Sequence, residues 1–85
     1  MSKKKILSFM KLAPDYCTVD LWCPLTSGNW EKDNITGRIY ADELLRHMRA
    51  TQSPMLLGHV VKAMKGRHAG VEVGFFHRIS EHLTS

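Results

Sequence analysis

The fold class is decided by residues 38–66, which read RIYADELLRHMRATQSPMLLGHVVKAMKG. In the first half of this stretch, apolar residues recur at the three- and four-residue spacing of an amphipathic helix. Acidic residues come early in this pattern and arginines come late, an order that suits the helix dipole. We therefore expect a helix over residues 38–50. Its apolar stripe consists of Tyr40, Ala41, Leu44, Leu45 and Met48.

The second half of the stretch contains the clearest helix start in the chain. Ser53 is suited to the N-cap and Pro54 to the first helical position, and Gly66 is suited to end the helix. We expect this second helix over residues 54–65. The link of about three residues between the two helices favours antiparallel neighbours. The apolar stripe of the second helix consists of Leu57, Val60, Val61 and Met64.

The C-terminal part of the chain permits two interpretations. A strand over residues 71–79 would place alternate apolar side chains on one face, whereas a helix would collect apolar side chains into a stripe. The length of the segment and its tail RISEHL favour a helix, which we expect over residues 73–82, with Gly74 allowing close packing. The helical stripe consists of Phe76, Ile79 and Leu83.

The N-terminal part of the chain is expected to be extended. In residues 16–23, apolar side chains at the odd-numbered positions alternate with a second set at the even-numbered positions. The segment also contains β-branched and aromatic residues, as is typical of a strand. Trp22 would point away from the apolar face of this strand. Residues 24–37 are rich in turn formers and are expected to form a loop, while residues 3–12 fit a short helix or a short strand. The apolar face of the strand consists of Cys17, Val19, Leu21 and Cys23.

Together these elements predict a mainly α fold: a small three-helix domain with an extended or β N-terminal segment. We expect a single domain over residues 1–85, because a chain of this length is too short for several hydrophobic cores. The inward stripes of the helices predict most of the core. The predicted core residues are Leu44, Leu45, Met48, Leu57, Val60, Val61, Met64, Phe76, Ile79 and Leu83.

Composition places the chain among globular proteins, with 44% hydrophobic residues and a formal net charge of +4. No apolar run approaches the roughly 18 residues of a membrane-spanning helix, so we expect no membrane partner. Two cysteines, Cys17 and Cys23, are too few for a disulfide framework. This cysteine usage indicates reduced thiols and predicts a cytoplasmic protein.

No sequence pattern for metal binding or catalysis is visible. In an extended strand, Cys17 and Cys23 would lie about 20 Å apart, too far for a shared metal ion or a disulfide. The histidines lack the four-residue spacing that turns two imidazoles toward one ion. There is no phosphate-binding glycine loop and no recognisable nucleophile with its base. We therefore expect no cofactor, no metal and no enzymatic activity.

The positive charge is concentrated in the middle of the chain, because residues 44–71 contain no acidic residue. Arg46 and Arg49 lie one helical turn apart, and a tight hairpin would bring them to Ser53 and the free N–H groups that open the second helix. The hairpin is therefore a candidate site for an anion or for nucleic acid. The candidate contacts are Arg46, Arg49, Ser53, Lys62, Lys65 and Arg67.

This basic hairpin also has a simpler interpretation. Lys62, Lys65 and Arg67 lie about 15 Å from the first cluster, at the end of the second helix, where cations stabilise a helix C-terminus. Two separated clusters with no aromatic residue between them make a poor surface for stacking bases. Any binding of nucleic acid is expected to be weak and non-specific.

The two tryptophans are candidate contacts for a protein partner, because tryptophan often anchors protein interfaces. Trp22 is expected on the outer strand face, where contact and packing are equally favoured; for Trp30, in the polar loop, packing over the core edge is favoured. The leading interpretation is a small non-enzymatic protein-interaction module, with a protein partner or a second copy of the chain. The alternative is a small basic nucleic-acid-binding protein that uses the hairpin of residues 44–71.

Overall fold

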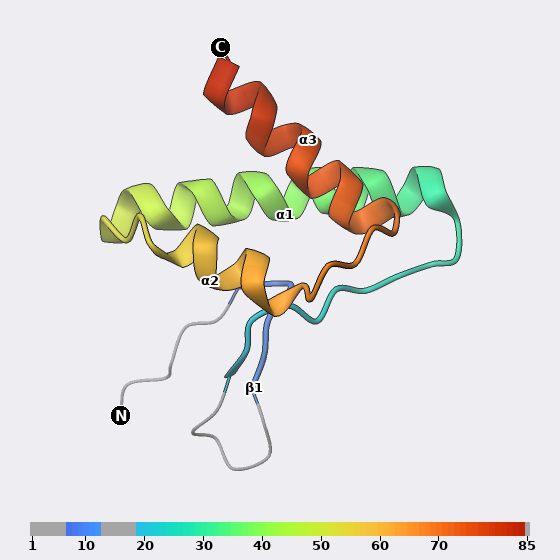
Figure 1. Cartoon of the computed structure of the whole chain (residues 1–85), viewed down its shortest axis with the longest axis horizontal. Coiled ribbons are helices and arrows are strands. Elements are labelled where there is room, and N and C mark those ends of the chain that lie inside the picture. The colour runs from blue at the N-terminus through green and yellow to red at the C-terminus, as the bar shows by residue number, and fades with distance from the viewer. Residues whose placement is uncertain (1–6, 13–18, 85) are drawn as a thin grey trace.

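The computed structural model of the protein describes residues 7–12 and 19–84. Within this part of the chain, a two-stranded antiparallel sheet precedes three helices (Figure 1). The predicted fold class, mainly α with a β segment at the N-terminus, is therefore confirmed. The elements are β1 (Lys11–Leu12), β2 (Val19–Asp20), α1 (Trp30–Thr51), α2 (Leu56–Ala63) and α3 (Gly70–Thr84).

The N-terminal segment forms a short hairpin, in which β2 lies within the expected strand and β1 lies within residues 3–12, where a short helix and a short strand were both considered. β1 and β2 are antiparallel, with Leu12 opposite Val19. Of the predicted strand over residues 16–23, only β2 has strand conformation among the described residues, and residues 16–18 lie outside them. The hairpin is tied to α1 by Ser8, which donates hydrogen bonds from its backbone N–H and its hydroxyl to the Glu43 carboxylate at 2.8 and 2.7 Å.

α1 begins at Trp30, well before the predicted start at residue 38. Asn29 is the N-cap, and its side-chain oxygen accepts a hydrogen bond from the backbone N–H of the third helical residue at 3.1 Å. The prediction of a loop over residues 24–37 is therefore wrong beyond Asn29. The turn formers of this segment cap a helix, and Gly37 lies inside α1, where it contacts α3.

α2 is shorter than the helix predicted over residues 54–65, and the expected N-cap is wrong. The capping position is held by Met55, whose side chain makes no capping hydrogen bond. Ser53 instead closes the preceding turn, because its carbonyl oxygen accepts a hydrogen bond from the N–H of Leu56 at 3.2 Å. The turn is displaced because α1 runs on to Thr51 and ends at Gln52, which has a left-handed φ of 53°.

α1 packs most extensively on α3, and not on α2 as the short link between them suggested (Figure 1). The two helices cross at glycines. A Cβ atom added at Gly74 would lie 2.0 Å from the carbonyl oxygen of Asn34, and one added at Gly37 would lie 1.9 Å from that of Val71. The backbones are therefore in direct contact, and the expected role of Gly74 in close packing is confirmed. The third helix itself is confirmed and is longer at both ends than predicted.

An aromatic cluster fills the space between the hairpin and the helices. The cluster consists of Phe9, Trp22, Tyr40 and Phe75. Their ring centroids lie 5.1 to 6.3 Å apart in tilted and edge-to-face pairs, arrangements that aromatic rings favour. Trp22 is only 2% exposed, and its indole Nε1–H donates a hydrogen bond to the Glu72 carboxylate at 2.7 Å. The predicted outward orientation of Trp22 is wrong because this buried partner, on α3, accepts its one polar hydrogen.

The remaining core follows the predicted stripes in part. Leu44, Val60, Met64 and Ile79 are buried as predicted, and three further predicted residues, Leu45, Met48 and Leu57, are partly buried. The prediction is wrong for Val61, Phe76 and Leu83, which are exposed because they lie on the outer faces of α2 and α3. None of the helices in the described part of the chain is long and apolar enough to cross a membrane.

Candidate functional site

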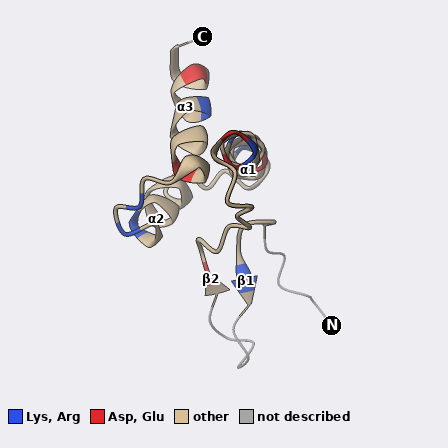
Figure 2. Cartoon of the chain, turned by 90° about the vertical axis from the view of Figure 1, so that its right-hand side faces the viewer, with Lys and Arg blue, Asp and Glu red and all other residues tan. Residues whose placement is uncertain are grey.

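The predicted basic residues do not form one site. Arg46 and Arg49 lie in the second half of α1, whereas Lys62 lies in the last turn of α2 and the other two cations follow in the connection to α3 (Figure 2). Ser53 does not join the first cluster to the start of α2, because it closes a turn there. The structure thus separates the two clusters to opposite ends of α2.

The first cluster lines a hollow of about 300 Å³ between α1 and α3, which we call the arginine hollow. It lies where the two helices diverge beyond their glycine crossing. Spacings of four and three residues along α1, and of four residues along α3, put side chains on the facing sides of the helices. The lining residues are Asp42, Leu45, Arg46 and Arg49 from α1, and Arg78 and His82 from α3.

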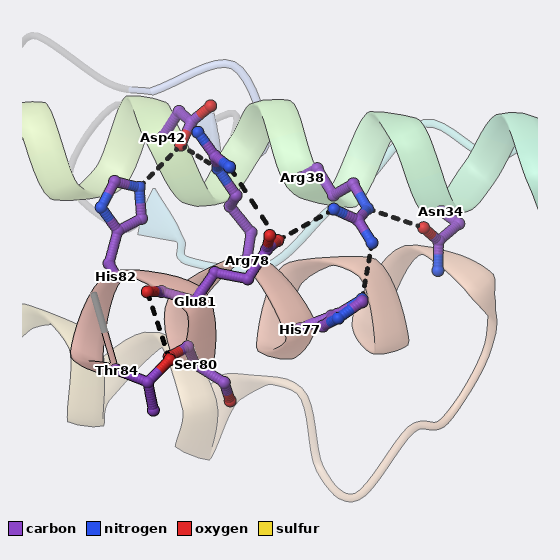
Figure 3. A network of polar contacts seen from close by, with 9 residues as sticks. All are labelled: Asn34, Arg38, Asp42, His77, Arg78, Ser80, Glu81, His82 and Thr84. Atoms are coloured by element: carbon purple, nitrogen blue, oxygen red, sulfur yellow. Dashed lines mark hydrogen bonds and ion pairs between the residues drawn. The ribbon is translucent and has the colours of Figure 1, made fainter.

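Asp42 organises the α3 side of the arginine hollow (Figure 3). Its carboxylate accepts a hydrogen bond from Nε of Arg78 at 2.8 Å, and Nε2 of His82 lies 3.1 Å from the same oxygen. The hydrogen bond from Arg78 is the main reason that the pKa of Asp42 lies below its ordinary value, although desolvation opposes it. The same bond raises the pKa of Arg78. Both groups are therefore charged at neutral pH.

A second polar cluster, around Arg38, lies next to that of Asp42 on the side toward Asn34 (Figure 3). Arg38 on α1 donates hydrogen bonds to the Asn34 side chain at 3.1 Å and to the Glu81 carboxylate at 2.9 Å, and it contacts Nδ1 of His77. The Glu81 carboxylate oxygen Oε1 also lies 3.9 Å from Nη1 of Arg78. Arg38 is thus held in an internal network, whereas no salt bridge of the described residues includes Arg46 or Arg49.

A larger hollow of about 560 Å³ lies between β2 and the start of α3. Its lining includes Cys23, His68 and Asp20, a combination that in principle permits thiol chemistry. Within residues 7–12 and 19–84, however, no hydrogen bond joins the exposed Cys23 to His68, and no group of three His, Cys, Asp or Glu residues is placed to hold a metal ion. Cys17, the other cysteine of the chain, lies outside the described residues.

A third candidate surface is apolar. Val73, Phe76 and Leu83 lie on one face of α3 and are 38%, 38% and 80% exposed. They follow each other at intervals of three and seven residues, so they form a stripe along the helix, which we call the α3 stripe. Trp30, for which packing was favoured, is 57% exposed, although one edge of its ring meets Gly70.

Arg46 and Arg49 were predicted from the sequence as anion contacts, whereas Asp42, Arg78 and His82 were not. A local signal for the last pair exists, because Arg78 and His82 are four residues apart in a predicted helix. Nothing local indicates that Asp42 faces them, since it comes from another helix. Comparison of the chain with models of protein families, with curated proteins and with solved structures gave no match. Function therefore has to be inferred from the geometry.

Proposed function

We propose that this protein is a small non-enzymatic protein-interaction module that acts in the cytoplasm and uses the α3 stripe as its contact surface. The observation that carries this proposal is the exposure of Phe76 and Leu83 on the same face of α3 as Val73. Large apolar side chains that share one helical face are typical of helices that pack against another element.

The proposal is supported by the other apolar stripe of α3, which already packs inside the protein. Val71, Phe75 and Ile79 already fill the core, and Gly74 already contacts α1. α3 therefore has apolar side chains on two faces, of which only one is covered by the described residues. Covering the α3 stripe would remove apolar surface from water, which contributes roughly 25 cal/mol for each Å² buried, against the entropy cost of association.

A second copy of the chain is one partner to test, because a stripe at intervals of three and seven residues suits pairing of helices. Size-exclusion chromatography with light scattering over a range of concentrations measures the mass in solution. If copies associate through the α3 stripe, Leu83→Glu should reduce the mass to that of one chain. Ile39→Glu is the matched control, since Ile39 is also exposed, at 60%, but lies on α1.

A different partner is tested by a photo-crosslinking amino acid placed at position 83 or at position 39 in cells. We expect a defined cross-linked product from position 83 and none from position 39. Equal products from both positions, or none from either, would contradict the use of the α3 stripe. The exposed Trp30 offers a second contact, whereas the buried Trp22 is not accessible to a partner.

Nucleic-acid binding is the second candidate function. The observation in its favour is that, among the described residues, none of the salt bridges uses the five cations of the predicted hairpin. Their separation into two clusters argues for non-specific contact with phosphates, with a dissociation constant of roughly 10⁻⁴ to 10⁻⁶ M at physiological salt. An electrophoretic shift that is sequence-dependent and nanomolar at that salt concentration would make it the leading function.

A further inference from the structure

The arginine hollow carries more positive charge than the structure neutralises. Three guanidinium groups and one carboxylate line it, which gives a net charge of about +2 when the imidazole of His82 is neutral. Asp42 hydrogen-bonds to one of the three, Arg78. Arg46 and Arg49 are exposed and take no part in the salt bridges of the described residues.

We propose that the arginine hollow is a binding site for a phosphate monoester dianion. Arginine suits this ligand because its planar fork donates two parallel hydrogen bonds to phosphate oxygens. The hollow, about 300 Å³ in volume, is at the small end of ligand sites and fits a phosphate with a small attached group. This site uses residues other than the α3 stripe and does not depend on the proposed interaction function.

The arrangement gives the arginines different roles. Arg46 and Arg49 lie one turn apart near the end of α1 and supply the two guanidinium groups that would bind the phosphate. Arg78 approaches from α3 and is held through its Nε by Asp42. Asp42 is thus a positioning residue, which fixes one guanidinium across the hollow from the other two. A preformed arrangement binds more tightly because fewer side chains lose freedom when the ligand arrives.

Charge distinguishes this ligand from the alternatives. A phosphate monoester carries about −1.5 to −2 at neutral pH, which matches the hollow, whereas a carboxylate would leave about one positive charge uncompensated. A nucleic acid presents one charge per phosphate along a chain, so it would also engage Lys62 and Lys65. Those residues lie in and just beyond the last turn of α2, outside the lining of the hollow.

The test is a titration of the ¹⁵N-labelled protein with phenyl phosphate at fixed ionic strength, followed by NMR, with benzoate as the carboxylate. We expect saturable shifts of the arginine Nε–H signals that line the hollow, and weaker binding of benzoate. R46Q/R49Q should weaken phenyl phosphate binding by about tenfold or more, because charged hydrogen bonds are lost. K62Q/K65Q removes the same charge elsewhere and should change binding by less than about twofold.

Thermal melts check that both double variants fold, which is expected because the four side chains are exposed. A phosphoserine peptide in a further titration distinguishes the source of the dianion. Tighter binding of the peptide than of phenyl phosphate would assign it to a phosphorylated protein, and equal binding would assign it to small phosphorylated molecules. Equal losses in the two double variants, no saturation, or tighter binding of a short DNA duplex that both double variants weaken would overturn the proposal.

Discussion

Where α1 and α3 cross, their backbones touch, whereas beyond the crossing the same two helices diverge and charged side chains occupy the space between them. At the crossing, Gly37 and Gly74 leave no room for even a Cβ atom. At the open end, Asp42 and Arg78 reach toward each other across the gap, and each is more than a third exposed. The difference indicates that the crossing determines stability, while the open end is free to carry a binding site. Substitutions at the two ends should therefore have effects of very different size.

The largest effect is expected at the core face of α3, next to the crossing. Phe75 is fully buried and its ring contacts those of Trp22 and Phe9. Phe75→Ala should reduce the free energy of unfolding by about 3–5 kcal/mol, measured by urea denaturation. The matched variant is Phe76→Ala, one residue further and 38% exposed, which should cost no more than about 2 kcal/mol. Equal costs would mean that the orientation of α3 is wrong.

The next largest effect is expected from the backbone contact itself. Gly74→Ala forces a methyl group against the carbonyl of Asn34 and should cost about 3 kcal/mol, because the helices would have to separate. Gly58→Ala is the control, since a Cβ atom there meets nothing within 4 Å. It should leave the free energy of unfolding unchanged or raise it by up to about 1 kcal/mol, as alanine favours helix. A tolerated Gly74→Ala would show that the helices do not cross so closely.

Features that depend on local sequence pattern could be predicted, whereas features that depend on how the helices pack together could not. The helical stripes were found because their signal is local, so Leu44, Val60, Met64 and Ile79 are buried as expected. On α3, two apolar stripes overlap, and the local pattern predicts a buried stripe through Phe76, whereas the structure buries the stripe through Phe75. Which of the two apolar faces is covered depends on how α1 and the segment around the hairpin pack against α3, and the local pattern of the sequence does not specify that.

Contacts between distant parts of the chain explain the other errors. Trp22 and its partner Glu72 are 50 residues apart, so alternation along the strand alone placed the indole on the wrong side. Asp42 and Arg78 are 36 residues apart, which is why only Arg46 and Arg49 among the residues lining the arginine hollow were predicted as anion contacts. The basic residues were recognisable by composition, but the hollow exists only because glycines set the crossing from which the helices diverge.

A smaller effect is expected where the chain enters α1, before the crossing. Asn29→Ala removes the side-chain oxygen that accepts the hydrogen bond from the first turn and should cost about 1 kcal/mol. Ser53→Ala, at the position that the sequence predicted as a cap, should cost less than about 0.5 kcal/mol, because Ser53 caps no helix. Urea denaturation of both variants measures the difference. A larger loss for Ser53→Ala than for Asn29→Ala would indicate that Ser53 caps a helix after all.

The smallest effect is expected at the open end and depends on pH. The pKa of Asp42 is lowered in the folded protein, chiefly by the hydrogen bond from Arg78, so its carboxylate stabilises the fold above its unfolded pKa of about 3.9. This contribution disappears as the pH falls through the lower folded value. It should be well under about 1 kcal/mol, because the side chain is 37% exposed and solvent screens the pair.

Asp42→Asn should therefore lower the free energy of unfolding slightly at pH 7 and have less effect at about pH 3, near the unfolded pKa. Urea denaturation at the two pH values measures the change. In an Arg78→Gln background, the pH-dependent part should shrink, because the main cause of the lowered pKa is gone. The same loss at both pH values would show that Asp42 acts through packing and not through its charge. Asp42 would then no longer count as the group that positions Arg78 for an anion, although the guanidinium groups of Arg46 and Arg49 would still line the arginine hollow.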